Sequence, residues 1–338
     1  MRAAVVGVGR MGRRHVQVIH DLGLELVGVC DSRADVVAAV AEEASLPPAL
    51  AFSDPDAMLR TSHPDCVIVA TTAQAHCELV CLAAEHNVKY VLCEKPMAVS
   101  LAECDRMIKC CRERGTRLAV NHQMRFMEQY TEPKRVAESE AFGGLSSVTV
   151  VAGNFGIAMN GTHYFEMFRF MTGEAPLGVT AWFSPDSVPN PRGPQFEDRA
   201  GIVRLRTASG KRFYMEAGAD QGHGVKVVYA GPFGQMAVDE LAGTVSLAVR
   251  QEEFRSLPTT RYGMPAVETT YRIVPADAVT PSRAVLNALL SGTDAPCGED
   301  GRLAVAVLVA SYVSNENGHV EVRVDDSVLP LERTFPWA

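Results

Sequence analysis

The chain has 338 residues, of which 47% are hydrophobic and 21% charged, and its formal net charge is −8. This composition is typical of a globular protein with enough apolar residues for two cores. The negative charge and the lack of a basic cluster exclude a nucleic-acid partner from our expectations. Because the chain contains no apolar run of membrane-spanning length and no secretion signal, we expect no membrane partner and a cytoplasmic location.

The nine cysteines are scattered along the chain and contain no C-x-x-C pair. A closed zinc site needs four convergent ligands, which this spacing does not provide. We therefore predict reduced cysteines and no metal site.

Residues 1–122 alternate short apolar runs with helical patterns. The runs rich in Val and Ile cover 2–8, 25–30, 65–71, 88–93 and 117–120, and the helical patterns cover 11–23, 34–45, 75–87 and 101–115. Uninterrupted apolar strands are typical of a parallel sheet that helices cover on both faces. The pattern predicts an α/β fold that begins with a Rossmann domain, a doubly wound parallel sheet, over residues 1–122.

Residues 123–338 follow a different pattern. A hairpin is predicted over 201–218, with alternating polar and apolar residues around a Ser-Gly turn, and further strands follow it to residue 274. Two helices are expected near the end, over 282–292 and 301–318, the second closing at Gly318. We predict a second α/β domain with an open, largely antiparallel sheet, and an ordinary loop for the Pro-rich stretch 184–196.

The stretch "VVGVGRMG" places three glycines directly after the first predicted strand. Gly7 allows a tight turn, Gly9 lets a pyrophosphate approach the backbone, and Gly12 allows close packing of helix on strand. The helix that begins here offers free N–H groups to phosphates. This motif in this context predicts dinucleotide binding.

Asp31 ends the second predicted strand, about twenty residues after the glycines. A carboxylate there accepts hydrogen bonds from the adenosine ribose and repels a 2′-phosphate, which favours NAD. The following Ser32 and Arg33 could instead bind that phosphate, so NADP stays open as the alternative cofactor.

The residues "EKP", Glu94 to Pro96, follow a buried strand at the carboxyl edge of the predicted sheet, where ligands of such folds bind. A lysine at this place can hydrogen-bond the substrate oxygen whose carbon exchanges a hydride, and its charge stabilises alkoxide character. Elsewhere a Glu-Lys pair is an ordinary surface feature.

The chain as a whole resembles the glucose–fructose oxidoreductase, inositol dehydrogenase and rhizopine-catabolism (Gfo/Idh/MocA) family. The resemblance rests on the order and spacing of "GVGRMG", "VIVATTAQAH", "EKP", "VNHQMRF", "NGTHYFEMFRFMTG" and "GEDGRLAVAVLVASYVSNENG". It implies a Rossmann domain followed by an α/β domain whose open sheet mediates assembly into a homodimer or homotetramer.

The resemblance also implies residue roles. The expected cofactor-binding residues are Gly7, Gly9, Arg10, Met11, Gly12, Asp31, Ser32, Arg33, Thr71, Thr72, His76, Glu94, Lys95 and Asn121. The expected substrate-binding residues are Lys95, Arg125, Asn160, His163 and Glu166. Lys95 and His163 would be catalytic, and an imidazole suits proton transfer because its ordinary pKa lies near neutral pH.

One position departs from the family pattern. Many members carry Asp four residues before the histidine, which completes a Lys-Asp-His set, whereas Met159 stands here. A thioether cannot orient an imidazole or share its proton. Asn160 could bind substrate or cap the next helix, and Glu166 could orient His163 or have a surface or inter-helix role.

The main functional hypothesis is an NAD(P)-dependent oxidoreductase that acts on a hydroxyl or keto group of a sugar, cyclitol or nucleotide-linked sugar. Two alternatives stay open. The first is a dinucleotide-binding sensor without turnover, which the loss of Asp at position 159 would allow. The second is a glycosidase or epimerase that oxidises its sugar transiently.

Overall fold

The computed structural model describes residues 1–337, which pack into two compact units. Unit 1 contains residues 1–123, the later segment Asp277–Val305 and the residues from Pro330 on. Unit 2 contains Met124–Ala276 and Ala306–Leu329. The domain assignment expected from the sequence, 1–122 and 123–338, stays a prediction, and this packing adds two later segments to the first unit.

Unit 1 is built on a parallel sheet of six strands. In chain order they are β1 (Arg2–Val6), β2 (Glu25–Cys30), β3 (Ala51–Phe52), β4 (Cys66–Val69), β5 (Tyr90–Cys93) and β6 (Arg117–Val120). Their order across the sheet is β3-β2-β1-β4-β5-β6. The predicted doubly wound sheet is confirmed, and the short β3 is a strand that the apolar pattern did not indicate.

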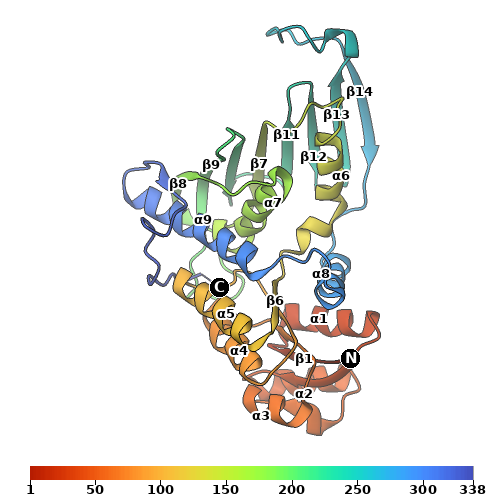
Figure 1. The fold of residues 1–338 in the computed structure, drawn as a ribbon, viewed down its shortest axis with the longest axis vertical. Coiled ribbons are helices and arrows are strands. Elements are labelled where there is room, and N and C mark those ends of the chain that lie inside the picture. Colours follow the sequence, from red (N-terminus) through yellow and green to blue (C-terminus); the bar gives the residue numbers. More distant parts are fainter. Residues whose placement is uncertain (338) are drawn as a thin grey trace. The chain divides into compact units, whose positions relative to one another are not determined.

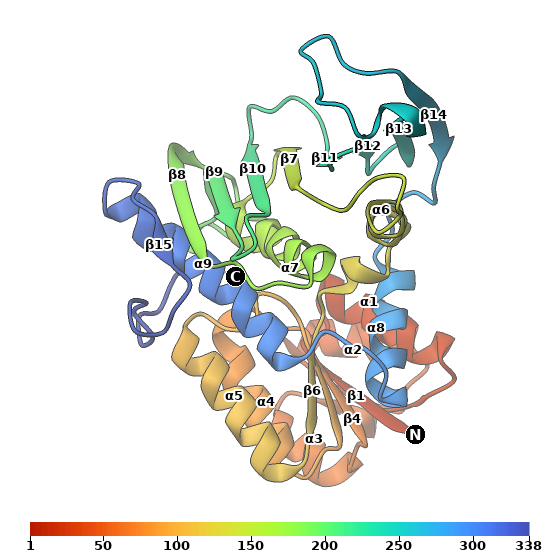
Figure 2. The ribbon, with the colours of Figure 1, turned by 45° about the horizontal axis from the view of Figure 1, so that its top comes forward.

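Helices cover both faces of this sheet, which explains why its strands are apolar on both sides. The helices are α1 (Arg10–Asp21), α2 (Ala34–Glu43), α3 (Pro55–Ser62), α4 (Ala73–Glu85), α5 (Leu101–Arg114), α8 (Val279–Ser291) and the first part of α9 (Gly298–Glu316). Helices α4 and α5 pack together on one face, and α1 and α8 pack together on the other (Figure 2). The pattern 282–292 therefore corresponds to α8, which completes unit 1.

Unit 2 is built on a sheet of nine strands in the order β14-β13-β12-β11-β7-β10-β9-β8-β15. The strands are β7 (Ser147–Gly153), β8 (Gly178–Ser187), β9 (Arg199–Arg206), β10 (Arg212–Gly218), β11 (Lys226–Ala230), β12 (Gly234–Asp239), β13 (Thr244–Arg250), β14 (Ala266–Arg272) and β15 (Val322–Arg323). All neighbours are antiparallel except β7 and β10, which run parallel. The sheet is therefore mixed but mostly antiparallel, as expected.

The predicted hairpin is present, since β9 and β10 pair antiparallel around a turn in which Gly210 has a φ of +88°. Helices α6 (Glu128–Ala137) and α7 (Thr162–Thr172) cover one face of the sheet (Figure 1). The π-helical turn η3 (Ile157–Gly161) leads directly into α7. The opposite face carries exposed apolar side chains, of which Trp182 is the largest at 54% exposure.

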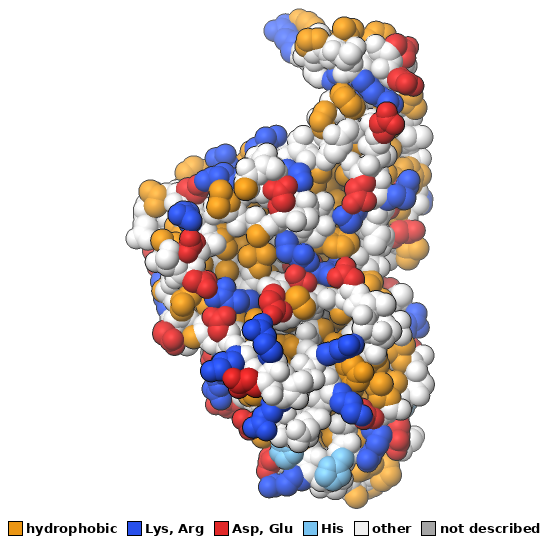
Figure 3. All heavy atoms as spheres, viewed as in Figure 1, with side chains coloured by type: hydrophobic (Ala, Val, Ile, Leu, Met, Phe, Trp, Pro, Cys, Tyr) orange, Lys and Arg blue, Asp and Glu red, His pale blue; other side chains and the backbone are white. Residues whose placement is uncertain are grey.

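The face of the molecule seen in Figure 3 mixes charges of both signs. Within residues 1–337, no helix has the length and apolar composition needed to cross a bilayer. All nine cysteines carry free thiols, and most of them are buried in unit 1.

Candidate functional site

The turn after β1 is too crowded for a side chain at Gly7 and Gly12. Gly7 has a φ of +85°, and a Cβ there would lie 2.7 Å from the carbonyl carbon of Ala70. A Cβ on Gly12 would lie 1.9 Å from the carbonyl oxygen of Gly7. Gly9 caps the N-terminus of α1. The backbone segments at this turn thus pack against one another as closely as the glycine spacing predicts.

Asp31, at the end of β2, fastens this turn. Its Oδ2 accepts a hydrogen bond from the Val8 amide at 3.0 Å, and its Oδ1 accepts one from the Arg33 amide at 3.1 Å. The Arg33 guanidinium lies 3.5 Å from the same carboxylate and is largely exposed. Each carboxylate oxygen has a second lone pair, so Asp31 retains acceptor capacity for ribose hydroxyls.

Glu94 lies at the centre of a buried hydrogen-bond network at the end of β5. Its Oε1 is 2.7 Å from Nε2 of His15 on α1 and accepts a hydrogen bond from Nδ2 of Asn121 at 2.8 Å. The same Asn121 nitrogen donates to Ser282 on α8 at 3.2 Å. Four segments that are distant in the sequence therefore meet beside Lys95.

The partners of Glu94 determine its charge. Burial alone would raise the pKa of this carboxyl, but the hydrogen bond and charge of His15, the charge of Lys95 and the Asn121 amide together lower the pKa to about 2. Glu94 is therefore an anion at neutral pH. It fixes the backbone from which Lys95 extends, because the Lys95 amide also faces its Oε2 at 3.4 Å.

The segment that follows Lys95 is held by His76 on α4. The peptide bond between Lys95 and Pro96 is cis. The Nδ1 of His76 lies 3.0 Å from the carbonyl oxygen of Pro96 and 3.2 Å from that of Met97, and its Nε2 lies 3.3 Å from that of Thr71. His76 is fully buried, so it links the ends of β4 and β5 from within unit 1.

A second support comes from the tail segment, residues 330–337. The rings of Phe335 and Trp337 stack at 4.5 Å between centroids, and Nε1 of the buried Trp337 donates to the carbonyl oxygen of Ala98 at 3.0 Å. The Phe335 amide donates to the carbonyl oxygen of Val99 at 3.0 Å. The tail segment thus binds the backbone immediately after "EKP".

His163 lies in the first turn of α7 in unit 2 and is buried. On the same helix, Glu166 forms ion pairs with the buried Arg125 and, at 3.0 Å, with Arg169. Burial raises the pKa of the Glu166 carboxyl, although both guanidiniums oppose that effect. Since Glu166 is held between two arginines, its role in orienting His163 stays a prediction.

The remaining predicted residues lie partly in unit 1 and partly in unit 2. Arg10 and Met11 open α1, Thr72 caps α4 with Thr71 before it, Ser32 follows β2, and Asn160 lies in η3. The residues of unit 1 gather at the carboxyl edge of the parallel sheet, and those of unit 2 surround the start of α7. The roles given to each residue stay predictions.

Sequence reasoning missed several polar groups that the structure buries around these residues. They are His15, Ser282, Trp337, Asp198 and Glu240. His15 had a detectable signal, because it lies three residues after Gly12 on the face of α1 that turns toward the sheet. The others come from segments far away in the sequence, and no local spacing indicates them.

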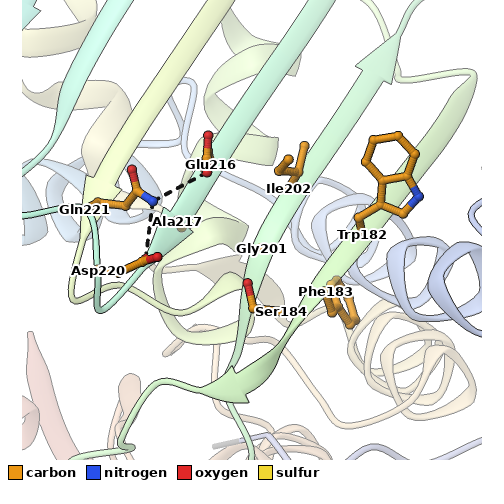
Figure 4. Close-up of a pocket in the computed structure, with 9 residues that line it drawn as sticks. All are labelled: Trp182, Phe183, Ser184, Gly201, Ile202, Glu216, Ala217, Asp220 and Gln221. Carbon is orange, nitrogen blue, oxygen red and sulfur yellow. Dashed lines mark hydrogen bonds between the residues drawn. The ribbon is translucent and has the colours of Figure 1, made fainter.

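A hollow of about 200 Å³ lies elsewhere, on the open face of the unit 2 sheet (Figure 4). Trp182, Ile202 and Glu216 project from neighbouring strands beside it, with Asp220 and Gln221 at its rim. It contains none of the predicted site residues.

Comparison with known proteins agrees with the Rossmann fold of unit 1. Residues 1–122 match a family model described as "Oxidoreductase family, NAD-binding Rossmann fold". The inositol 2-dehydrogenase of Salmonella typhimurium is 25% identical over 95% of this chain and 96% of its own length. The inositol 2-dehydrogenase 2 of Saccharopolyspora erythraea is 28% identical over 80% of this chain and 82% of its own.

A solved structure shows the same fold over nearly the whole chain. It is an oxidoreductase from Agrobacterium radiobacter, in complex with NAD+, L-tartaric acid and magnesium, with a TM-score of 0.79 and 22% identity. The match covers 96% of this chain and 98% of that one. The match over residues 1–122 and the two similar dehydrogenases thus indicate an NAD-binding oxidoreductase. Residues 1–122 match the NAD-binding Rossmann fold of that oxidoreductase family, and the chain as a whole is similar to the two inositol dehydrogenases.

The residues of unit 1 fit NAD. The glycine turn leaves backbone exposed where a Cβ would otherwise block approach, and Asp31 retains acceptor capacity. Asn121 is fully buried, and its Oδ1 has no hydrogen-bond partner among the described residues. A buried carbonyl oxygen without a partner is costly, so a ligand donor there would stabilise it.

Proposed function

We propose that the protein is an NAD-dependent dehydrogenase or reductase that acts on a hydroxyl or keto carbon of a sugar, cyclitol or nucleotide-linked sugar. The observation that carries the proposal is the Glu94 network, which anchors Lys95 at the ligand-binding edge of the parallel sheet. The names of the two inositol dehydrogenases support a polyol substrate.

Each proposed residue has a defined task. When bound, NAD supplies the hydride acceptor or donor. The glycine turn and the N-terminus of α1 would hold its pyrophosphate, and Asp31 its adenosine ribose. Lys95 would donate a hydrogen bond to the reacting oxygen and stabilise negative charge on it.

His163 would complete the reaction by moving the hydroxyl proton. During oxidation it would accept this proton, and during reduction it would return it. Arg125 and Asn160 would bind further hydroxyls of the substrate. Since Arg125 already pairs with Glu166, it would offer only its remaining donors.

The test compares Lys95→Met with the wild type. A methionine keeps the apolar stem of the lysine and removes its charge, so turnover with NAD and a polyol panel should fall by roughly 10²–10⁴-fold. Affinity for NADH, measured by calorimetry, should change little because the glycine turn and Asp31 are untouched. A Lys95→Met variant with full turnover would contradict the assignment.

The same calorimetric experiment decides the cofactor. Tight binding of NADH with weak binding of NADPH would support Asp31 as the ribose acceptor, and the reverse would favour Ser32 and Arg33. NADH binding without hydride transfer to any polyol would favour the sensor. Sugar conversion without net NADH would favour transient oxidation.

Assembly through the unit 2 sheet is part of the proposal. Its open face carries Trp182, Ile202, Val151 and Val228, each at least 38% exposed. Strand β14 lies at one edge of that sheet and is exposed along most of its length. Exposed edges and apolar faces are usually covered, so we expect a homodimer or homotetramer, measurable by light scattering.

A further inference from the structure

Three cysteines of unit 1 lie together where α4 packs on α5 (Figure 2). Cys77 and Cys81 belong to α4, and Cys110 belongs to α5. The thiol of Cys81 interacts by hydrogen bonds with the thiols of both Cys77 and Cys110. The Cys110 thiol also donates to the backbone carbonyl oxygen of Cys81 at 3.8 Å. Three free thiols, here called the thiol chain, therefore connect the two helices.

One end of the thiol chain is accessible to solvent, and the other is buried. Cys77 and Cys81 are 1% and 3% exposed, whereas Cys110 is partly exposed. At the buried end, the Cys77 thiol donates to the carbonyl oxygen of Glu103 at 3.6 Å. A dissolved reagent therefore meets Cys110 first, with Cys81 directly behind it.

The geometry favours a disulfide between the helices over one within α4. Cys77 and Cys81 are about one helical turn apart, and side chains at that spacing have Cβ atoms about 5–6 Å apart. A disulfide needs Cβ atoms roughly 3.5–4.5 Å apart, so α4 would have to distort to join this pair. Cys81 and Cys110 belong to different helices, which can approach by a small shift without losing helical hydrogen bonds.

The groups around Cys110 keep its thiol protonated at neutral pH. Burial, the neighbouring Cys81 and the charge of Glu85 on α4 raise the pKa of the Cys110 thiol to about 11, and Arg114 on α5 opposes them. Since the thiolate is the form that attacks an oxidant, oxidation should be slow at neutral pH and become faster as pH rises.

We propose that the thiol chain is an oxidation site for hydroperoxides, at which Cys110 and Cys81 form a reversible disulfide between α5 and α4. The Cys110 thiolate attacks the terminal oxygen of the hydroperoxide, so that an S–O bond forms, the O–O bond breaks and the leaving alkoxide or hydroxide takes up a proton. The Cys81 sulfur then attacks the Cys110 sulfenic acid, which forms the S–S bond and releases water.

This reaction is balanced. The two cysteines lose two electrons and two protons, and the hydroperoxide gains both as it becomes an alcohol, or water, and a second molecule of water. The inference goes beyond the proposed function and does not depend on it, since neither cysteine belongs to the proposed site of hydride transfer.

The test is oxidation of the full chain with hydrogen peroxide, followed by alkylation of the remaining thiols and digestion with trypsin. Cleavage after Lys and Arg places Cys77 and Cys81 in fragment 61–89 and Cys110 in fragment 110–112. We expect one cross-linked species of these two fragments, which tandem mass spectrometry assigns to Cys81 and Cys110 and which dithiothreitol separates. A bond through another cysteine, or Cys110 recovered only as sulfinic or sulfonic acid, would overturn the proposal.

Matched variants identify the two partners independently. Cys110→Ser and Cys81→Ser should each abolish the cross-link. Cys111→Ser removes the adjacent thiol in the same tryptic fragment and should retain it. Cys77→Ser should also retain it, because the bond between the helices does not include that thiol. Circular dichroism of the reduced variants checks their folding, and a cross-link that survives Cys110→Ser in a folded variant excludes Cys110 as the partner.

The rate of cross-linking is a second measurement that needs no change to the thiol chain. Because pH 7 and pH 8 both lie below the pKa of Cys110, the thiolate fraction should rise about tenfold between them, and the rate with it. Cys297→Ser removes an exposed thiol of the same unit and should leave this rate unchanged. Equal rates at the two pH values would contradict attack by the Cys110 thiolate.

Discussion

Glu94 in unit 1 and Glu240 in unit 2 are both buried among hydrogen-bond donors, and their two carboxyls behave in opposite ways. In unit 1, His15, Asn121 and the charge of Lys95 lower the pKa of Glu94 to about 2. In unit 2, burial raises the pKa of Glu240 to about 7, and the hydroxyls of Tyr130 and Tyr164 oppose this effect only in part.

The difference lies in the partners, because both carboxyls are almost completely buried. Neutral phenols donate hydrogen bonds to Glu240, at 2.8 Å each, but bring no positive charge. A cationic neighbour and amide donors favour the anion at Glu94. Unit 1 thus keeps a negative charge at the carboxyl edge of its sheet, whereas unit 2 holds a carboxyl that changes charge near neutral pH.

The largest effect is expected for Glu94→Gln. This change removes an anion that several groups stabilise, so the free energy of unfolding at pH 8 should fall by about 2–4 kcal/mol. Because the folded pKa lies below the unfolded one, the stability from Glu94 is present at neutral pH and is lost as pH falls below about 4.5. Urea titrations should show that Glu94→Gln flattens this acid limb. Equal stability of variant and wild type at pH 8 would contradict the comparison.

Glu240→Gln should have a smaller effect with the opposite dependence on pH. The folded pKa of Glu240 lies above the unfolded one, so its protonated form stabilises the fold below about pH 4.5. That contribution, roughly 3 kcal/mol, is lost as pH rises to about 7. The difference in the free energy of unfolding between wild type and Glu240→Gln, measured by urea titration, should therefore decline across this pH window. A difference that is constant from pH 4.5 to 8 would refute the role of the charge.

The smallest expected effects compare two tyrosines beside Glu240. Tyr164→Phe removes a hydrogen bond to the carboxylate and should cost about 1–2 kcal/mol at pH 8. Tyr229 is the matched control, since its buried hydroxyl has no partner among residues 1–337, and Tyr229→Phe should be neutral or stabilising. Thermal unfolding of both variants measures the contrast. Equal losses would mean that the carboxylate does not distinguish the two hydroxyls.

The sequence predicted unit 1 better than unit 2 for a physical reason. Strands buried on both faces and the turn from Gly7 to Gly12 are local signals, so the parallel sheet and its ligand edge could be recognised. The segment Asp277–Val305 gave no sign that α8 packs beside α1, because that contact depends on tertiary packing.

The same limit applies to the site. The positions of Glu94 and Lys95 at the end of β5 followed from the strand pattern. Their support by His15 and Ser282, and the approach of Asp198 to position 159, depend on contacts between residues that are 39 to 161 positions apart. Such contacts have no periodicity that a single sequence can reveal.

The discontinuity of unit 1 has a consequence for biosynthesis. A ribosome that has released the first 123 residues has delivered all six parallel strands, but not α8, whose Ser282 receives the amide of Asn121. The apolar face that α8 covers therefore stays exposed while some 150 further residues are translated. During that interval we expect chaperones to bind it. A gene fragment that stops at residue 123 should accordingly aggregate, even though it encodes the entire Rossmann sheet.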